Sequence, residues 1–182
     1  MNLMYVSYPK HKRKIKEIYL GSFPKNERFP YSILKYTAKE KNVVLNSVVD
    51  KDGIIGTYYI VKCDDLYYLM YFAIDKEFRN KGYGSRVLND LKMKYKNIFL
   101  SIEKKDDELA IRRKNFYLRN GFCETRKYYL DNGVMYEVLC TNNNFEITSN
   151  ILKKRYSNMS NSKLIKYIIG KMFNMNNIKI IR

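Results

Sequence analysis

The sequence predicts an α/β or α+β fold, in which a mixed β-sheet carries helices on its faces. Three observations lead to this class. A length of 182 residues fits one compact domain. Hydrophobic residues make up 46% and charged residues 29%, which is ordinary for a globular protein. Up to about residue 140, β-branched or aromatic runs alternate with segments whose apolar residues recur at helical spacing.

The N-terminal part of the chain contains two predicted helices and four predicted strands. Ile15, Ile18 and Tyr19 recur at helical spacing beside a basic face, which predicts an amphipathic helix. Two prolines end this helix before a second one begins. Runs of β-branched residues on both sides of a turn that contains Gly53 are typical of a β-hairpin. The predicted elements are strand 2–8, helix 12–20, helix 31–40, strand 42–49, strand 54–63 and the central strand 66–74.

The second part alternates helices and strands up to residue 140. Val87, Leu88 and Leu91 share one face of a predicted helix, and Gly121 is a C-terminal stop for another. The predicted elements are helix 82–95, strand 97–103, helix 109–120, strand 122–130, strand 134–140 and helix 162–173.

Beyond Cys140 the composition shifts to Asn, Ser and Lys, so we predict a domain over residues 1–140 and a basic extension over residues 141–182. We expect this extension to pack on the domain. Its helix is interpreted either as a packed terminal helix or as one that binds a membrane surface or a partner.

Rare residue types exclude several classes of protein. Cys63, Cys123 and Cys140 form no C-x-x-C motif, which excludes a disulfide scaffold and a Cys-based zinc finger and favours a reducing, cytoplasmic location. The single histidine, His11, excludes metal sites that need two imidazoles and disfavours a Ser-His-Asp hydrolase. No apolar run approaches 18 residues, and the N-terminus lacks the pattern of a signal peptide. We therefore expect neither a transmembrane segment nor secretion.

The net charge of +17 is the strongest compositional feature. Such basicity is often a sign of nucleic-acid binding. The excess is spread over the body of the chain, however, and is concentrated only in the tail, where residues 141–182 hold 8 of the 35 basic residues and 1 of the 18 acidic ones. Attraction for an anionic ligand or surface is therefore the better interpretation, and dedicated nucleic-acid binding is disfavoured.

A glycine-containing loop carries the chemistry that the sequence suggests. The loop R-N-K-G-Y-G-S, residues 79–85, lies between a buried strand and an amphipathic helix. Its glycines allow close approach of the backbone to a ligand, and the helix adds its free N-terminal amides. Arg79 and Lys81 add positive charge, so the loop fits a diphosphate. A Rossmann fingerprint would need Gly or Ala at Val87, and a Walker A loop would need a lysine before Ser85.

Two stretches resemble motifs of the GNAT N-acetyltransferase superfamily. The pattern R-x-x-G-x-G from Arg79 to Gly84, after a strand that ends F-A-I-D, resembles its acetyl-CoA-binding motif. The stretch N-F-Y-L-R-N-G-F, residues 115–122, is similar to the second motif of this family, and strand 98–103 separates the two as expected. The resemblance covers residues 3–140. It implies a mostly antiparallel sheet of six to seven strands flanked by about four helices, with the C-terminal helical tail added.

The resemblance also implies a cosubstrate, acetyl-CoA, and no metal. Backbone groups of Phe72, Ala73 and Ile74 would pair with the pantetheine arm as if it were an added strand. The loop residues expected to hold the pyrophosphate are Arg79, Asn80, Lys81, Gly82, Tyr83, Gly84 and Ser85.

Two catalytic residues are expected from the same resemblance. Tyr117 would donate a proton to the CoA thiolate, whose conjugate acid has a pKa of about 8.5. Glu103 ends a buried strand on the same face as Ser101 and is the candidate base for the amine, directly or through a water. A solvated carboxylate at the strand end is the alternative for Glu103. The acidic residues that follow, Asp106, Asp107 and Glu108, could supply the base or attract an amine instead.

One position departs from the family pattern. Many relatives have an asparagine seven residues before the tyrosine, where this chain has Ala110. Arg112, Arg113 and Lys114 could meet the phosphates of the cosubstrate in its place, or could form a solvated helix face.

The expected function is transfer of an acetyl group from acetyl-CoA to a primary amine, by direct attack in a ternary complex. No cysteine has a histidine partner, so an acyl-enzyme has no support. The acceptor is a small molecule or a protein amine, and the basic surface disfavours a polycationic one. The first two helices, the loop 23–30 and the end of the final hairpin should set its specificity. The alternatives are a non-catalytic GNAT-like interaction protein and a binder of nucleic acid or anionic surfaces through the tail. The sequence leaves open whether the chain forms a homodimer.

Overall fold

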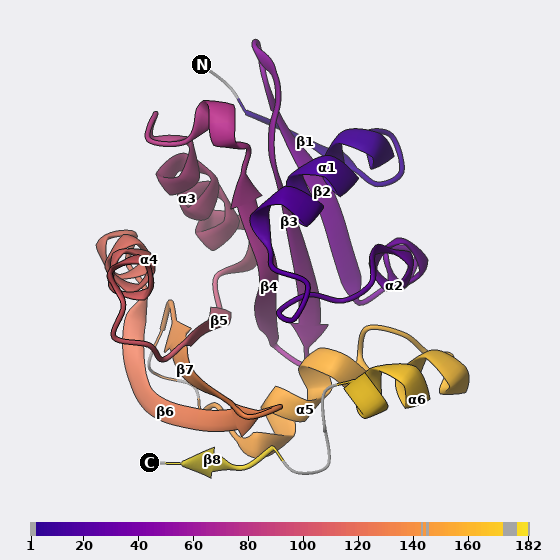
Figure 1. Ribbon diagram of the computed structural model, residues 1–182, viewed down its shortest axis with the longest axis vertical. Coiled ribbons are helices and arrows are strands. Elements are labelled where there is room, and N and C mark those ends of the chain that lie inside the picture. The colour runs from indigo at the N-terminus through magenta and orange to yellow at the C-terminus, as the bar shows by residue number, and fades with distance from the viewer. Residues whose placement is uncertain (1–2, 143, 145, 173–177, 182) are drawn as a thin grey trace.

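The protein is described here by a computed structural model, which covers residues 3–142, 144, 146–172 and 178–181 (Figure 1). Helices and strands alternate along most of the chain. The strands are β1 (Met4–Ser7), β2 (Val43–Asp50), β3 (Gly53–Cys63), β4 (Leu66–Ile74), β5 (Ile98–Glu103), β6 (Cys123–Asp131), β7 (Val134–Cys140) and β8 (Ile180–Ile181). The α-helices are α1 (Lys12–Ser22), α2 (Tyr31–Thr37), α3 (Tyr83–Tyr95), α4 (Glu108–Arg119), α5 (Ser149–Ser157) and α6 (Lys163–Met172), with a 3₁₀ turn at Lys76–Phe78.

Within the described part of the chain, the strands form one sheet of eight in the order β1-β2-β3-β4-β5-β7-β6-β8. Neighbouring strands are antiparallel except β4 and β5, which the crossover helix α3 joins in parallel. The predicted mixed, mostly antiparallel α/β fold is confirmed. The sheet has one strand more than the upper prediction because Ile180 and Ile181 pair with Tyr129 and Tyr128 at its edge. Two isoleucines are too short a run to be recognised as a strand from sequence.

The helices cover both faces of the sheet. Val87, Leu88 and Leu91 of α3 belong to one core cluster, against which α4 packs Phe116 and Tyr117. The other cluster gathers buried residues of the remaining helices: Ile15, Tyr19, Ile33, Leu34, Leu152, Tyr156, Ile165 and Ile169. Figure 1 shows α3 and α4 on one side of the sheet, with α1 and α2 on the other. We call these the α3–α4 face and the α1–α2 face.

Helix α5 was not expected. Only one helix, over residues 162–173, was predicted in the extension, and it is present as α6. Thr148 caps α5 by accepting a hydrogen bond from the Ile151 amide at 3.3 Å, and Leu152, Arg155 and Tyr156 are buried. Helix α5 has no clear apolar periodicity, because one of its three buried residues is an arginine. A prediction based on the spacing of apolar residues therefore misses it.

Strands β4 and β5 diverge shortly after they meet. They pair only at Tyr67–Ile98 and Tyr68–Phe99, although both strands continue well beyond. On its other edge β4 has a register shift, because Tyr71 pairs with Tyr59 and Leu69 with Ile60. Met70 is therefore an extra residue in β4, and such a bulge bends its strand. The divergence opens a gap within the sheet between the two faces.

Candidate active site

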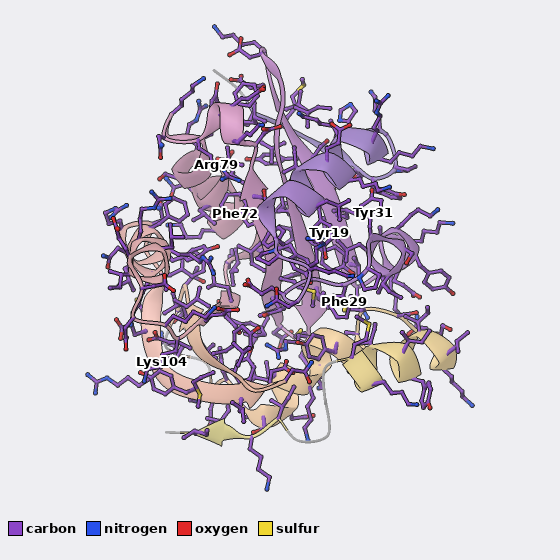
Figure 2. All side chains as sticks on the ribbon, in the orientation of Figure 1. Tyr19, Phe29, Tyr31, Phe72, Arg79 and Lys104 are labelled. Carbon is purple, nitrogen blue, oxygen red and sulfur yellow. The ribbon has the colours of Figure 1, made fainter. Side chains whose placement is uncertain are left out.

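A cavity of about 690 Å³ occupies the opening between β4 and β5. Residues 69–74 of β4 and 100–103 of β5 form its two long walls. One end, which we call the loop end, is lined by Arg79, Asn80, Gly82, Gly84 and Ser85. The other, which we call the aromatic end, is lined by Phe23, Phe29, Tyr68, Tyr71, Tyr129, Tyr136 and Tyr156. Figure 2 labels Arg79 and Phe29 on either side of Phe72.

Backbone geometry at the loop end fits an anion. Asn80 and Gly82 have φ values of +61° and +78°, in the left-handed region that favours glycine. Helix α3 begins directly after them at Tyr83, so its first amides have no partner within the helix. A Cβ atom on Gly82 would meet nothing within 4 Å, so the space in front of the loop is open.

The basic side chains of the loop have different roles from one another. Arg79 donates from Nε to the Ile74 carbonyl at 3.0 Å and from Nη2 to the Ser22 hydroxyl at 3.2 Å, which ties α1 to the end of β4. The Lys81 ammonium lies 5.4 Å from the centre of the Phe78 ring, and Lys81 is absent from the cavity lining. Arg79 thus lines the cavity while it also holds the loop in place.

Two of the loop positions serve packing. Tyr83 is buried and donates from its hydroxyl to Asp50 Oδ2 at 2.6 Å, away from the cavity lining. A Cβ on Gly84 would lie 3.0 Å from Cζ of Phe116, so Gly84 allows α4 to approach α3 closely. The side chain of Tyr83 anchors α3 to the sheet, and only its backbone is left for a ligand.

The wall from β4 has a free edge. Phe72, Ala73 and Ile74 line the cavity beyond the point where β5 stops pairing. An extended ligand could hydrogen-bond to that edge as an added strand. Gly56 lies opposite Ile74, and a Cβ there would be 2.7 Å from the Ala73 carbonyl oxygen. Glycine is therefore required for β3 to support this part of β4.

Tyr117 reaches the cavity from α4. Its ring packs against Phe116 and Phe122, with ring centres 5.4 and 5.5 Å away. Burial raises the pKa of the Tyr117 hydroxyl to about 12, although Arg113 acts in the opposite direction. The hydroxyl is therefore protonated at neutral pH, and it makes no hydrogen bond to any of the described residues. It is available as a proton donor.

Glu103 lies on the opposite face of the sheet. It is only 7% exposed, forms an ion pair with Lys105 and lines the cavity. Alternation along β5 places it on the same face as Phe99, which belongs to the cluster under α1 and α2. The gap between β4 and β5 thus joins a tyrosine hydroxyl on the α3–α4 face with a carboxylate on the α1–α2 face.

A second carboxylate accompanies Glu103. Glu27, from the connection between α1 and α2, also lines the cavity. Burial raises the pKa of Glu27, and the negative charge of Glu103 raises it further, whereas Arg113 and Lys105 lower it. The loop 23–30 was expected to affect acceptor specificity, but Glu27 itself was not predicted as a site residue. Glu27 is the one acidic residue in this loop, and that was the feature of the sequence that could have identified it.

The acidic residues after Glu103 lie elsewhere. Asp106, Asp107 and Glu108 are exposed and absent from the cavity lining. Asp107 caps α4, where its Oδ1 accepts a hydrogen bond from the Ala110 amide at 2.8 Å. The arrangement therefore favours Glu103 over its neighbours as the base.

The helix α4 adds positive charge to the cavity. Arg112, Arg113 and Arg119 line it, whereas Lys114 forms ion pairs with Glu124 and Glu137 at 3.0 and 2.9 Å. Ala110 is buried at the start of the helix. Arg112 and Arg113 therefore line the cavity, where they can contact an anionic ligand in place of the asparagine that this chain lacks at position 110, whereas Lys114 does not.

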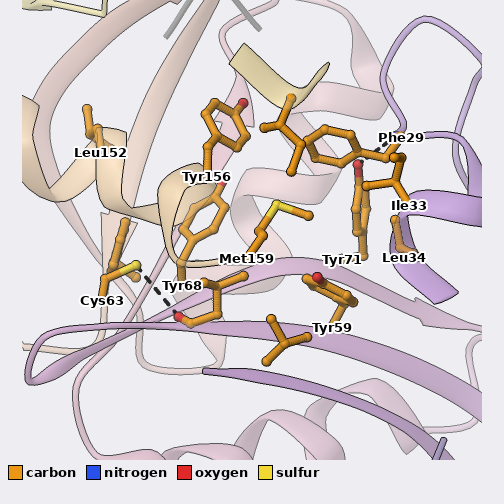
Figure 3. Packing of buried hydrophobic residues seen from close by; sticks show 14 of the residues in the cluster. Phe29, Ile33, Leu34, Tyr59, Cys63, Tyr68, Tyr71, Leu152, Tyr156 and Met159 are labelled. Atoms are coloured by element: carbon orange, nitrogen blue, oxygen red, sulfur yellow. Dashed lines mark hydrogen bonds between the residues drawn. The ribbon is translucent and has the colours of Figure 1, made fainter. Parts of the chain in front are cut away.

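The extension contributes to the aromatic end. Arg155 and Tyr156 of α5 line it, and neither was identified from the sequence. The Arg155 guanidinium is 1% exposed and forms a salt bridge with Asp131 at 2.9 Å. Figure 3 shows Tyr156 close to Tyr68, Phe29 and Tyr71. Nothing in a basic, polar stretch of sequence indicates that one of its arginines is buried.

The described residues contain no group of three or more His, Cys, Asp or Glu side chains placed to hold a metal ion. None of the helices they form is both long and apolar enough to cross a membrane.

Comparisons with known proteins agree on one family. Residues 41–124 match the model of the GNAT acetyltransferase domain. A GNAT-family protein from Bacteroides thetaiotaomicron is 27% identical, with a TM-score of 0.70 over 94% of this chain and 97% of that one. An acetyltransferase from Bacillus subtilis in complex with CoA is 14% identical, with a TM-score of 0.58 over 76% and 97%.

An aminoglycoside 6′-N-acetyltransferase complexed with coenzyme A is 13% identical, with a TM-score of 0.59 over 75% of this chain and 95% of that one. No curated protein matches the sequence significantly. The matched region spans β4, the glycine loop, α3 and α4, which together form most of the cavity. Residues 41–124 therefore form a GNAT acetyltransferase domain, and this domain together with its structural neighbours makes the protein an acyl-CoA-dependent N-acyltransferase.

Proposed function

We propose that this protein transfers the acetyl group of acetyl-CoA to a primary amine, in one step within a ternary complex. One observation carries the proposal. A single cavity between β4 and β5 is lined by an anion-binding loop, a free strand edge, a protonated tyrosine and a pair of carboxylates.

The residues present fit acetyl-CoA. The free amides at the start of α3, beside Asn80 and Gly82, suit a pyrophosphate, and Arg112 and Arg113 of α4 add positive charge to the cavity. The unpaired edge at Phe72–Ile74 suits the amides of the pantetheine arm. Two of the similar structures hold CoA, which supports this cosubstrate here. When bound, it supplies a thioester whose carbonyl carbon accepts the amine.

The carboxylate pair takes the proton of the amine. An alkylammonium with a pKa near 10.4 is protonated at neutral pH and must lose a proton before it can attack. Glu103 and Glu27 line the same end of the cavity, and the raised pKa of Glu27 brings that carboxyl closer to neutral pH. Glu103 or Glu27, directly or through a water, accepts this proton, and the free amine then attacks the thioester carbonyl. The second proton, which the nitrogen loses as the amide forms, balances the one that the sulfur gains.

Tyr117 completes the reaction on the other side of the gap. As the C–S bond breaks, the sulfur takes up negative charge, and the protonated Tyr117 hydroxyl donates its proton there. The products are an N-acetylated amine and free CoA thiol. Among the described residues, none of the three cysteines lines the cavity, and burial raises the pKa of the Cys63 thiol to about 12, which favours direct transfer over an acyl-enzyme.

The test combines binding with turnover. Acetyl-CoA should raise the melting temperature with increasing concentration, because a ligand that binds only the folded state stabilises it. A panel of primary amines should then release CoA thiol in a chromogenic assay. No thermal shift at millimolar acetyl-CoA would refute the cosubstrate. A shift without thiol release for any amine would favour the non-catalytic alternative.

A further inference from the structure

The aromatic end of the cavity is built by five separate parts of the chain. The rings come from the α1–α2 connection, β4, β6, β7 and α5. Phe29 and Tyr156 meet edge to face with ring centres 6.0 Å apart, and Phe23 and Tyr71 do so at 4.9 Å. Edge-to-face contacts of this kind hold aromatic side chains in defined orientations. The wall is therefore preformed.

A row of side chains leads from the carboxylates into this wall. Glu103 pairs with Tyr136 across β5 and β7, and Tyr136 pairs with Tyr129 across β7 and β6. Residues directly opposite each other have Cβ atoms about 5 Å apart on the same face of the sheet. The Tyr129 and Tyr136 rings stack at 5.3 Å with an interplanar angle of 15°. An amine held at Glu103 would thus extend its body along Tyr136.

Arg155 fixes the wall and offers little charge to the cavity. Its guanidinium carbon lies 4.4 to 5.3 Å from the ring centres of Tyr156, Tyr129 and Tyr68. It donates hydrogen bonds to the hydroxyls of Tyr129 and Tyr68 and pairs with the carboxylate of Asp131. Because Arg155 is neutralised by Asp131 and buried, it is a positioning residue. The carboxylates that line this end are those of Glu27 and Glu103, and Lys105, which pairs with Glu103, is absent from the lining.

We infer that the acceptor is a small primary amine on a flat aromatic body, with its nitrogen at Glu27 and Glu103 and its ring along Tyr136. The inference rests on the proposed function and names its substrate class. Charge complementarity selects the ammonium, and the fixed rings select the flat body. A carboxylate on the acceptor is disfavoured, because it would enter the site beside two carboxylates. The basic surface, which disfavours a polycationic acceptor, does not exclude a single ammonium at this end of the cavity.

Three amines and one amino acid test the inference. They are 2-phenylethylamine, 2-cyclohexylethylamine, propylamine and phenylalanine, each titrated by calorimetry into the full chain saturated with CoA. We expect 2-phenylethylamine to bind about tenfold tighter than the cyclohexyl compound and the short amine, with no measurable binding of phenylalanine. Equal affinities, or tighter binding of phenylalanine, would overturn the inference.

A pair of variants locates the effect. Tyr136→Leu removes the ring next to Glu103 and should reduce the phenyl-over-cyclohexyl preference to about twofold or less. Tyr128→Leu is the matched control, since Tyr128 lies on the opposite face of β6, is also half-buried and is absent from the cavity lining. It should leave the preference unchanged. An unchanged preference in Tyr136→Leu would overturn the placement of the ring.

Binding and transfer separate the two proposals. If 2-phenylethylamine binds preferentially but no thiol is released, the substrate class stands and the catalytic proposal fails. If all amines are acetylated with equal kcat/KM, the catalytic proposal stands and the aromatic class fails.

Discussion

The loop end and the aromatic end of the cavity are assembled in different ways. The loop end is formed by one stretch of chain, from the last residues of β4 to the first turn of α3. The aromatic end is formed by side chains from Phe23 to Tyr156, which approach one another only in the folded sheet. A contiguous site needs only local backbone geometry, whereas a dispersed one depends on every element that supports it. The two ends should therefore respond differently to substitution.

The largest expected effect concerns the gap between the two ends. Tyr117→Phe keeps the ring and its packing against Phe116 and Phe122 while it removes the proton. Acid catalysis by a positioned group is typically worth about 10²–10⁴-fold, so kcat should fall within that range. Thiol release under saturating acetyl-CoA measures the fall. The thermal shift with acetyl-CoA should be retained, and an unchanged kcat would show that Tyr117 only packs.

The next effect tests how far the aromatic end depends on α5. Arg155→Ala leaves Asp131, which is 4% exposed, as a buried charge without its cation. Breaking a buried ion pair in this way costs about 3–5 kcal/mol, which urea denaturation would show as a lower free energy of unfolding.

Two further variants control this result. Lys154→Ala, one residue earlier, removes only an exposed pair with Asp64 and should cost about 1 kcal/mol or less. The double variant Arg155→Met with Asp131→Asn should recover part of the loss. If Arg155→Ala and Lys154→Ala lose equal stability, α5 is not integral to this end of the cavity.

A substitution at the loop end should remove acetyl-CoA binding, and its left-handed φ should also lower the melting temperature of the free protein. Gly82→Val places a β-branched side chain in the open space in front of the loop and at a φ of +78°. The stabilisation by acetyl-CoA, about 2.7 kcal/mol at a concentration of 100 times Kd, should then be lost. Differential scanning fluorimetry with and without acetyl-CoA measures it. The preference for 2-phenylethylamine over propylamine in the absence of CoA serves as the control, and a retained acetyl-CoA shift would contradict the anion site.

The smallest effect is a shift in pH dependence. The pKa of Glu27 is raised by burial and by the charge of Glu103, so kcat/KM should fall with decreasing pH as Glu27 becomes protonated. Glu103→Gln removes that negative charge and should lower the pKa of Glu27. The acidic limb of the pH–rate profile should therefore move to lower pH, beneath a reduced plateau. A limb that stays in place would show that the two carboxyls act independently.

The contiguous features of this protein could be predicted from its residues alone. The strand Leu66–Ile74, the glycine loop and the helix with Phe116 and Tyr117 follow from apolar periodicity, from two glycines and from motif spacing, all of which are local properties. The mixed, mostly antiparallel sheet was predicted as well, and its parallel pair is β4 and β5, which a helix connects. The loop end and Tyr117 were therefore accessible from sequence.

Tertiary structure decided the aromatic end. The roles of Glu27, Tyr136 and Arg155 depend on partners more than 20 residues away: Glu103 for Glu27 and Tyr136, and Asp131 for Arg155. Apolar periodicity indicates only which apolar side chains are buried. A basic tail is therefore predicted to be solvent-exposed, even though Asp131 and three tyrosines surround its Arg155 in the folded chain. The bulge at Met70 that opens the cavity has no sequence signal either, since it arises from the register between β3 and β4. Long-range register and the pairing of buried charges are properties of the folded chain, and they set where the acceptor end of this site lies.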